Sequence, residues 1–365
     1  MRNQKPDVTI LIPTHNRANL LIRNLEWLSM SSYPIVIADS SNHSNSEEIY
    51  KRLSNTRIKL KYLHSSNKDY YSKISEAAEE VTSQYMVVCP DDDYILWQNI
   101  EHFHSYALET NASTICGRDL KYSNKDNFHF FEENSRYRRF CIRDHSSKID
   151  HLTAGMNPIV CTYYQFYKTR TFKDIWKLAE EQKSSMPGNK FVEILFRSAC
   201  FINGPVYFYN MPLRIIGDEP PLRSHDSSTA IQKYTLNFWD EFQAMKASGS
   251  LNIFIDALAE YTSKHLGIKL NSSRILVKDN ILKPMLERMH IRHEILWDQQ
   301  YSVVFSNNFA KDNVKRLNSH IQVQYSLRNT SFRLPAFIIN LEDYIFREKN
   351  QWKNIIDFIR YYETT

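Results

Sequence analysis

Short apolar runs alternate with amphipathic stretches through the N-terminal part of the chain. Four runs rich in β-branched and aliphatic side chains, each closed by a polar residue or proline, cover residues 8–12, 35–38, 58–63 and 85–89. Runs of this length and composition are typical of strands. Between them, residues 16–30 and 70–82 carry apolar side chains at helical spacing. Strands separated by such helices predict right-handed crossovers and a parallel sheet, so we expect an α/β fold.

Further along the chain the pattern is less regular. Strands are predicted at residues 113–116, 163–167, 206–209 and 213–216, and helices at 172–181 and 190–199. Residues 119–150 are polar, aromatic and charged without clear periodicity, which indicates an insertion or a mobile loop. From about residue 229 the spacing is mostly helical. We therefore expect an α/β domain over residues 1–230 and a mainly helical domain over 231–365, which would make acceptor, oligomer or membrane-surface contacts.

The composition is that of a globular protein, and it excludes several classes of function. Of the 365 residues, 42% are hydrophobic and 24% are charged, which argues against a disordered or fibrous chain. The net charge of +5 is too small to indicate a nucleic-acid-binding protein. The sequence has 7 glycines and neither Gly-x-Gly-x-x-Gly nor Gly-Lys-Ser/Thr, so we do not expect a standard dinucleotide-binding or P-loop enzyme.

The cysteines and the apolar stretches bear on where the protein works. The 5 cysteines include no Cys-x-x-Cys pair, which favours free thiols in a reducing compartment over a zinc module. The first apolar stretch is too short for a signal peptide, and none is long enough to cross a bilayer. We expect a cytoplasmic protein, and we leave open a peripheral contact with the inner face of the membrane and a homodimer.

Three adjacent acids, Asp91, Asp92 and Asp93, directly follow the fourth predicted strand and Pro90. In parallel α/β sheets, ligands bind beyond the carboxyl ends of the strands. Adjacent carboxylates repel one another unless a cation or solvent compensates them. A hard ion such as Mg2+ or Mn2+ can do so while it also binds diphosphate oxygens. The alternative is a solvated acidic turn.

Two further polar segments follow the second and first predicted strands. Asp39 directly follows the second predicted strand, where a carboxylate can accept hydrogen bonds from a nucleoside; the alternative is an Asx-turn or a helix N-cap. The first strand is followed by Thr14, His15, Asn16 and Arg17, which open a helix. This brings backbone donors and the positive end of a helix dipole to the same edge of the sheet. A plain N-cap is the alternative for Asn16.

These segments resemble family 2 glycosyltransferases of the GT-A fold, in which a mostly parallel, Rossmann-like sheet is flanked by helices. Residues 8–17 are similar to the opening of that family, residues 35–41 resemble its second-strand motif, and Asp91-Asp92-Asp93 resembles its Asp-x-Asp signature. The resemblance fades over residues 160–225. It departs from the family at Ala38, which replaces the first acid of the second-strand motif. The metal motif also aligns in two registers, one of which puts Pro90 in place of its first acid.

The resemblance implies roles for the candidate residues. The expected metal ligands are Asp91, Asp93 and His225. The residues expected to bind the nucleotide sugar are Pro13, Thr14, Asn16, Arg17, Asp39, Lys73, Asp91, Asp92 and Arg223. Lys73 stands where the family often places a basic residue that reaches the diphosphate, although by itself it reads as an ordinary helix-surface lysine. Arg223 and His225 would belong to a loop that closes over the diphosphate; a proline-rich linker is the alternative.

A direct displacement at the anomeric carbon needs a general base for the acceptor hydroxyl. Glu193 lies in the first turns of a predicted helix and resembles the catalytic acid of the family. Its alternative role is a helix N-terminal glutamate stabilised by the helix dipole. Asp174, Glu180 and Glu181 are the competing carboxylates.

The sequence thus predicts an inverting, metal-dependent glycosyltransferase. It would move a sugar from a nucleotide sugar to a hydroxyl of a glycan or lipid-linked glycan, in bacterial surface polysaccharide synthesis. A UDP-sugar is the expected donor, and a CMP-sugar stays open. One alternative is a catalytically silent sugar-binding or scaffold protein, against which the acid triad and Glu193 argue. The other is a nucleotidyltransferase, whose usual glycine-rich N-terminal loop is absent here.

Overall fold

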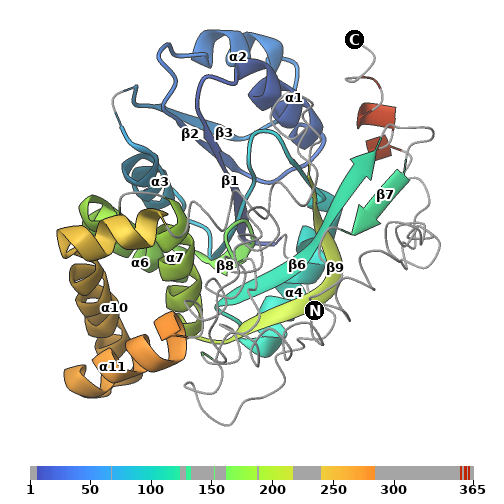
Figure 1. The fold of residues 1–365 in the computed structure, drawn as a ribbon. Coiled ribbons are helices and arrows are strands. Elements are labelled where there is room, and N and C mark those ends of the chain that lie inside the picture. The colour runs from blue at the N-terminus through green and yellow to red at the C-terminus, as the bar shows by residue number, and fades with distance from the viewer. Residues whose placement is uncertain are drawn as a thin grey trace, which may run out of the picture.

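The computed structural model describes residues 6–66, 68–123, 129–132, 152, 162–186, 189–216, 240–283, 354–355, 357–359 and 361. Within these ranges the chain forms one mixed sheet with helices on both faces, and further helices pack beyond one face (Figure 1).

The N-terminal half of the sheet is parallel, as the sequence predicts. Its strands are β1 (Val8–Thr14), β2 (Ile35–Asp39), β3 (Leu60–His64) and β4 (Tyr85–Val88). They lie in the order β3-β2-β1-β4, and each neighbouring pair is parallel. All residues of β1, β2 and β4 are buried, which explains why these strands read as continuous apolar runs. The expected α/β class is confirmed.

The second half of the sheet mixes both directions. Its strands are β5 (Tyr94–Ile95), β6 (Thr114–Ser123), β7 (His129–Glu132), β8 (Phe166–Lys168) and β9 (Val206–Ile216). The path continues from β4 as β8-β6-β9-β5, with β7 paired to β6. β8 runs antiparallel to β4 and β6, whereas β9 runs parallel to β6. Residues 119–123 and 129–132 of the predicted insertion are therefore strand, and the rest of it lies outside the described residues.

The two strands predicted at 206–209 and 213–216 are a single strand. The register of β9 against β6 shifts where Cys116 faces Phe208 and Arg118 faces Pro212, so β9 has extra residues at this point. A bulge of this kind accommodates a proline that would otherwise interrupt the ladder. The sequence break at Pro212 therefore marks an irregularity inside one strand.

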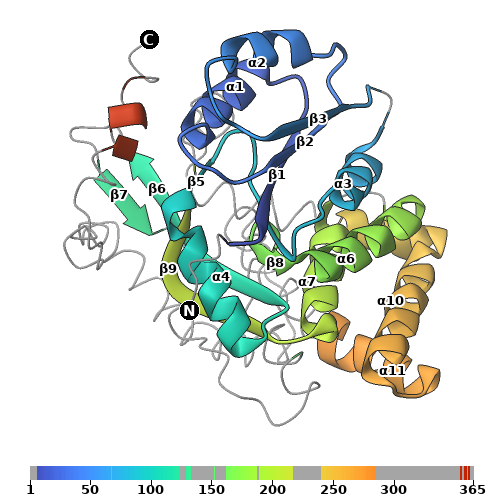
Figure 2. The same cartoon turned by 180° about the vertical axis from the view of Figure 1, so that it is seen from behind.

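Side chains of β1 alternate between two hydrophobic clusters, one on each face. Val8, Ile10 and Ile12 pack with α1 (Ala18–Leu28) and α4 (Ile100–Thr110), whereas Leu11 packs with the helices of the other face. Those helices are α3 (Tyr70–Glu79), α6 (Thr169–Gln182) and α7 (Asn189–Asn203) (Figures 1 and 2). A short helix, α2 (Ser46–Arg52), connects β2 to β3. Covering both faces is the normal condition for a parallel sheet.

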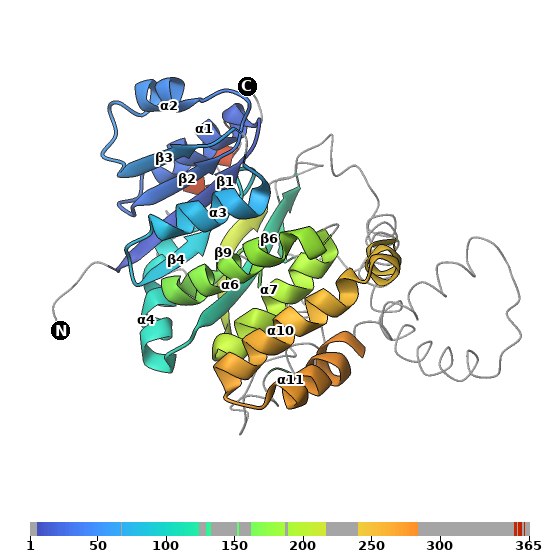
Figure 3. The same ribbon diagram turned by 90° about the vertical axis from the view of Figure 1, so that its left-hand side faces the viewer.

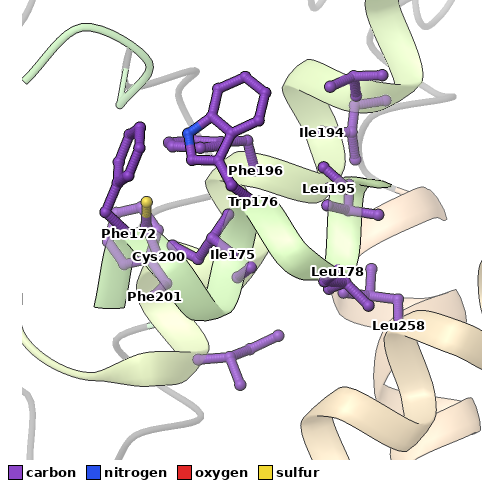
Figure 4. Close-up of a cluster of buried hydrophobic side chains, with 14 of the residues drawn as sticks. Phe172, Ile175, Trp176, Leu178, Ile194, Leu195, Phe196, Cys200, Phe201 and Leu258 are labelled. Atoms are coloured by element: carbon purple, nitrogen blue, oxygen red, sulfur yellow. The ribbon is translucent and has the colours of Figure 1, made fainter. Parts of the chain in front are cut away.

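The helices after residue 240 extend the cluster built by α6 and α7. They include α10 (Ser250–Leu266) and α11 (Leu270–Leu276), followed by a π-helical segment, Val277–Leu282. Figure 3 shows α10 beside α7, and Figure 4 shows Leu258 of α10 near Leu178 of α6, in a cluster with Trp176 and Phe196. The helical character expected for this part of the chain is thus seen in residues 240–283. The expected boundary near residue 230 lies outside the described residues.

The C-terminal residues that the structure describes return to α1. Ile355 and Ile359 are buried, and the ring of Phe358 lies 5.4 Å from that of Trp27 and 6.1 Å from that of Tyr94. In the described part of the chain, no helix combines the length and hydropathy that a membrane span requires.

Candidate active site

The polar ends of β1, β2 and β4 meet at one edge of the sheet. Thr14, the last residue of β1, stands in register with Asp39, the last residue of β2. The Thr14 hydroxyl donates a 2.7 Å hydrogen bond to Oδ2 of Asp91, three residues beyond the end of β4. The structure therefore brings together the candidate residues that the sequence places on three separate strands. Pro13 is buried within β1 and faces Ala38 in the β1–β2 register.

Asp39 is 1% exposed, and both of its carboxylate oxygens accept hydrogen bonds. The backbone N–H of Ser41 donates to Oδ1 over 2.7 Å, and the Tyr62 hydroxyl donates to Oδ2. Burial, together with the bond to Asp39, raises the pKa of Tyr62 to about 12, so this hydroxyl stays a donor at neutral pH. Asp39 thus makes the Asx-turn contact that the sequence indicates as the alternative role. It does so at the strand end where nucleoside binding is expected.

Asn16 ties the loop after β1 to the loop after β2. Its backbone φ is 55°, in the left-handed region that asparagine tolerates better than most residues. Its N–H donates to Oγ of Ser41 over 2.7 Å, and its Oδ1 accepts from the N–H of Asn42 over 3.0 Å. The N-cap of α1 is Arg17, so Asn16 does not have the plain capping role.

The three acids after β4 divide into two groups by the arginine that each one contacts. Nη1 of Arg17 lies 3.3 Å from Oδ1 of Asp91 and 3.1 Å from Oδ2 of Asp92. The Arg17 side chain is 38% exposed, whereas that of Asp91 is 6% exposed. Burial raises the pKa of the Asp91 carboxyl, and the bonds from Thr14 and Arg17 oppose that shift. These two acids form the part of the triad that faces a partly exposed cation.

Asp93 points instead to a buried arginine on β9. Nη1 of Arg214 lies 2.9 Å from Oδ2 of Asp93, while its Nε and Nη2 donate to the two carboxylate oxygens of Asp119 over 3.0 and 2.9 Å. The side chains of all three residues are 5% exposed or less. Asp119 and Arg214 stand opposite each other in the β6–β9 register. This buried arrangement fixes the end of the acidic turn.

Sequence reasoning did not identify Asp119 or Asn24 as parts of the site. The Asn24 side-chain amide, on α1, donates to the backbone carbonyls of Pro90 and Asp93 over 3.0 and 2.9 Å. Asp119 lies 95 residues from its partner Arg214 along the chain. Neither residue belongs to a motif, so the local sequence carries no signal for these contacts.

Asp91 and Asp92 fit a divalent cation better than Asp93 does. Magnesium in proteins is commonly held by one or two carboxylates together with phosphate oxygens of a substrate. Arg17 is partly exposed, so a cation can take its place without breaking a buried ion pair, whereas Asp93 is held by the buried Arg214. In the ranges that the structure describes, no three His, Cys, Asp or Glu side chains are grouped to hold a metal. The candidates His225 and Arg223 lie outside those ranges.

Lys73, on α3, is buried rather than exposed on the helix surface. It is 4% exposed, and its Nζ donates to the carbonyl of Thr14 over 2.6 Å and to Oγ of Ser40 over 3.0 Å. The ammonium group of Lys73 therefore lies at the ends of β1 and β2, where it bonds to the protein itself.

A group of tyrosines connects this edge with Glu193 on α7. Burial raises the pKa of Tyr71 to about 12, with smaller contributions from Glu241, Asp69 and Glu193. Burial likewise raises the pKa of Tyr163 well above its usual value, and Glu193 adds to this shift. Of the competing acids, Asp174 contributes to the raised pKa of Tyr261 and Glu180 to that of Lys183. Glu193 thus adds to the pKa shifts of Tyr71 and Tyr163.

Two neighbouring tyrosines, Tyr70 and Tyr164, lie near the acidic turn; their rings are 5.8 and 4.9 Å from those of Tyr71 and Tyr163. The hydroxyls of Tyr70 and Tyr164 lie 3.4 Å apart. The guanidinium of Arg214 lies 5.1 Å from the ring centre of Tyr164, and Nζ of Lys73 lies 5.6 Å from that of Tyr70. This aromatic group therefore contacts Lys73 and Arg214 on the side of the strand ends, and its Tyr163 ring packs 5.0 Å from Phe196 of α7.

Residues 9–176 match the family model described as Glycosyl transferase family 2. The resemblance to family 2 glycosyltransferases is confirmed. The matched region contains β1 to β4, the acidic turn and Lys73. The observed sheet, with helices on both faces and a helical region after it, agrees with the GT-A fold that the resemblance implies.

Individual relatives are distant. "Glycosyltransferase GlyA" of Streptococcus pneumoniae serotype 4 is 22% identical over 217 residues, which are 56% of this chain and 30% of that protein. The chain thus spans less than a third of the length of this relative. Solved structures of S. aureus TarS are also similar. A 1–349 fragment has 13% identity and a TM-score of 0.44, with 82% of this chain and 94% of the fragment covered. A second TarS structure has 12% identity and a TM-score of 0.42, with 75% and 54% covered. The family and curated matches support a glycosyltransferase.

Proposed function

We propose that this protein is an inverting glycosyltransferase that moves a sugar from a nucleotide sugar to a hydroxyl of a glycan or lipid-linked glycan. The observation that supports this best is the meeting of Asp39, Thr14 and Asp91 at the carboxyl edge of three parallel strands. A UDP-sugar is the favoured donor and a CMP-sugar the alternative. Synthesis of bacterial surface polysaccharide is the process in which we place it.

In this proposal the donor lies across the strand ends. The nucleoside contacts the loops that follow β1 and β2, where Asn16 and Asp39 are held by hydrogen bonds to Ser41. The phosphates lie toward Arg17 and the acidic turn. When bound, Mg2+ or Mn2+ would be held by Asp91 and Asp92 and would neutralise charge on the departing nucleotide.

Glu193 acts as the general base in the proposed reaction. Its carboxylate takes the proton of the acceptor hydroxyl while that oxygen forms a bond to the anomeric carbon. The bond between the anomeric carbon and the phosphate oxygen breaks, and its electron pair leaves with the nucleotide. A single displacement of this kind inverts the anomeric centre.

The test is Glu193→Gln, measured both for donor binding and for transfer. We expect unchanged nucleotide affinity and turnover lowered by about a hundredfold or more, because a positioned base is lost. Glu181→Gln, at an exposed carboxylate on α6, is the matched control and should keep full activity. NMR of the product linkage should show inversion. Retention of configuration, or full turnover in Glu193→Gln, would remove Glu193 from this role.

A further inference from the structure

Lys73 holds two loops of the proposed donor site at once. Its Nζ donates to the carbonyl of Thr14, at the end of β1, over 2.6 Å. It also donates to the hydroxyl of Ser40, just after β2, over 3.0 Å. The residue is 4% exposed, and the ring centre of Tyr70 lies 5.6 Å from the ammonium.

Each of these acceptors leads to a residue of the candidate site. The Thr14 hydroxyl donates to Asp91, so a shift of Thr14 also moves a hydrogen-bond partner of the acidic turn. Ser40 directly follows Asp39, and its N–H donates to the same Thr14 carbonyl over 3.2 Å. The Lys73 ammonium therefore bonds directly to the loops after β1 and β2, and through Thr14 it is connected to the turn after β4.

The charges around Lys73 suit a fixed internal cation. The carboxylates of Asp39 and Asp91 favour its protonated form, whereas burial, the larger effect, lowers its pKa. A buried ammonium is stable only when its donors find acceptors and nearby charges compensate it. The acceptors are provided by Thr14 and Ser40, and the compensating charges by Asp39 and Asp91. The protein itself thus satisfies the Lys73 ammonium, with no need of a ligand.

We propose that Lys73 is a positioning residue for the nucleoside half of the donor site, which it shapes by holding Thr14 and Ser40, and that it does not contact the donor diphosphate. This inference rests on the proposed function. It predicts that removing the ammonium weakens binding of a nucleoside as much as binding of its diphosphate. A lysine that reached the diphosphate would affect only the second ligand.

The experiment measures uridine and UDP binding, and cytidine and CMP binding, to the full chain by NMR titration. One pair, uridine and UDP or cytidine and CMP, should bind to the wild type. In Lys73→Met we expect the affinity for both ligands of that pair to fall by about tenfold or more, with the ratio of the two affinities unchanged within about twofold. Lys68→Met, at an exposed lysine paired with Glu76, is the matched control and should bind as the wild type does. Loss of UDP or CMP affinity with unchanged nucleoside affinity would overturn the inference.

A second variant keeps the test decisive if Lys73→Met folds poorly. Ser40→Ala leaves the lysine in place and removes one of its acceptors. It should weaken the binding of nucleoside and nucleotide by equal factors, and by less than Lys73→Met does. Hydrogen exchange adds a readout that needs no ligand. The Ser40 amide should exchange about tenfold faster in both variants, because its bond to the Thr14 carbonyl loosens. Unchanged exchange in both would overturn the positioning role, whereas a wild-type protein that binds no nucleotide would overturn the proposed function itself.

Discussion

Replacing Arg214 with methionine would leave Asp93 and Asp119 as buried carboxylates without their shared cation. Their side chains are each 3% exposed, and Arg214 makes three bonds to them of 2.9 to 3.0 Å. Removing one partner of a buried ion pair typically costs about 3–5 kcal/mol, because the remaining buried charge has lost its counter-charge and is poorly solvated. We expect a loss of that size in the free energy of unfolding at neutral pH.

The assay is urea denaturation of the wild type and Arg214→Met at pH 7. The triple variant with Asp93→Asn and Asp119→Asn should recover part of the loss. Arg274→Met is the control, because its bond to Asp256 joins side chains that are 39% and 47% exposed and should contribute less than about 1 kcal/mol. An Arg214→Met loss no larger than that of the control would refute the reasoning.

Three further predictions concern packing and pH. Gly117→Ala should cost about 1–3 kcal/mol in denaturation, because the added Cβ would lie 2.5 Å from the Cβ of Leu213; a neutral result would contradict this packing. Asp69 caps α3, so Asp69→Ala should cost about 1 kcal/mol at pH 7. Burial alone would raise the pKa of the Asp69 carboxyl, but hydrogen bonds from Lys183 and Ser72 outweigh this effect and lower the pKa to about 2. The contribution of Asp69 to the free energy of unfolding is therefore complete above the unfolded pKa of 3.8 and should vanish as pH falls through 2. Burial raises the pKa of Tyr62 to about 12, so the free energy of unfolding should decline as pH rises from 10 towards 12. The absorbance of tyrosinate measures the ionisation. If a Tyr62→Phe protein loses stability over the same alkaline range, this assignment is contradicted.

The parallel half of the sheet and its polar edge could be predicted because their signals are local. β1, β2 and β4 are buried along their whole length, so each reads as one apolar run. Once the strands are parallel, Asp39 and Asp91 must lie at the same edge, whatever the details of the loops.

The rest depends on contacts between distant parts of the chain. Arg214 lies 121 residues from Asp93 along the sequence, and only the closing of β9 beside β5 and β6 brings them together. The burial of Lys73 likewise follows from the packing of α3 against the strand ends and from the Tyr70 ring, which helix periodicity does not reveal. The sequence predicts separate strands at 206–209 and 213–216. Pro212, which lies between them and cannot donate to a ladder, is accommodated by a register shift inside β9.

The central claim is that the edge formed by β1, β2 and β4 binds a nucleotide sugar and releases its nucleotide. The most direct measurement is phosphorus NMR of a panel of UDP- and CMP-sugars incubated with the full chain, with and without Mn2+. Water serves as the acceptor when no glycan is supplied. We predict that one donor is consumed with release of UDP or CMP, and that Asp39→Ala slows this release by about tenfold or more at a donor concentration that is limiting for the wild type. Consumption of no donor under any condition, or wild-type release by Asp39→Ala, would contradict the account.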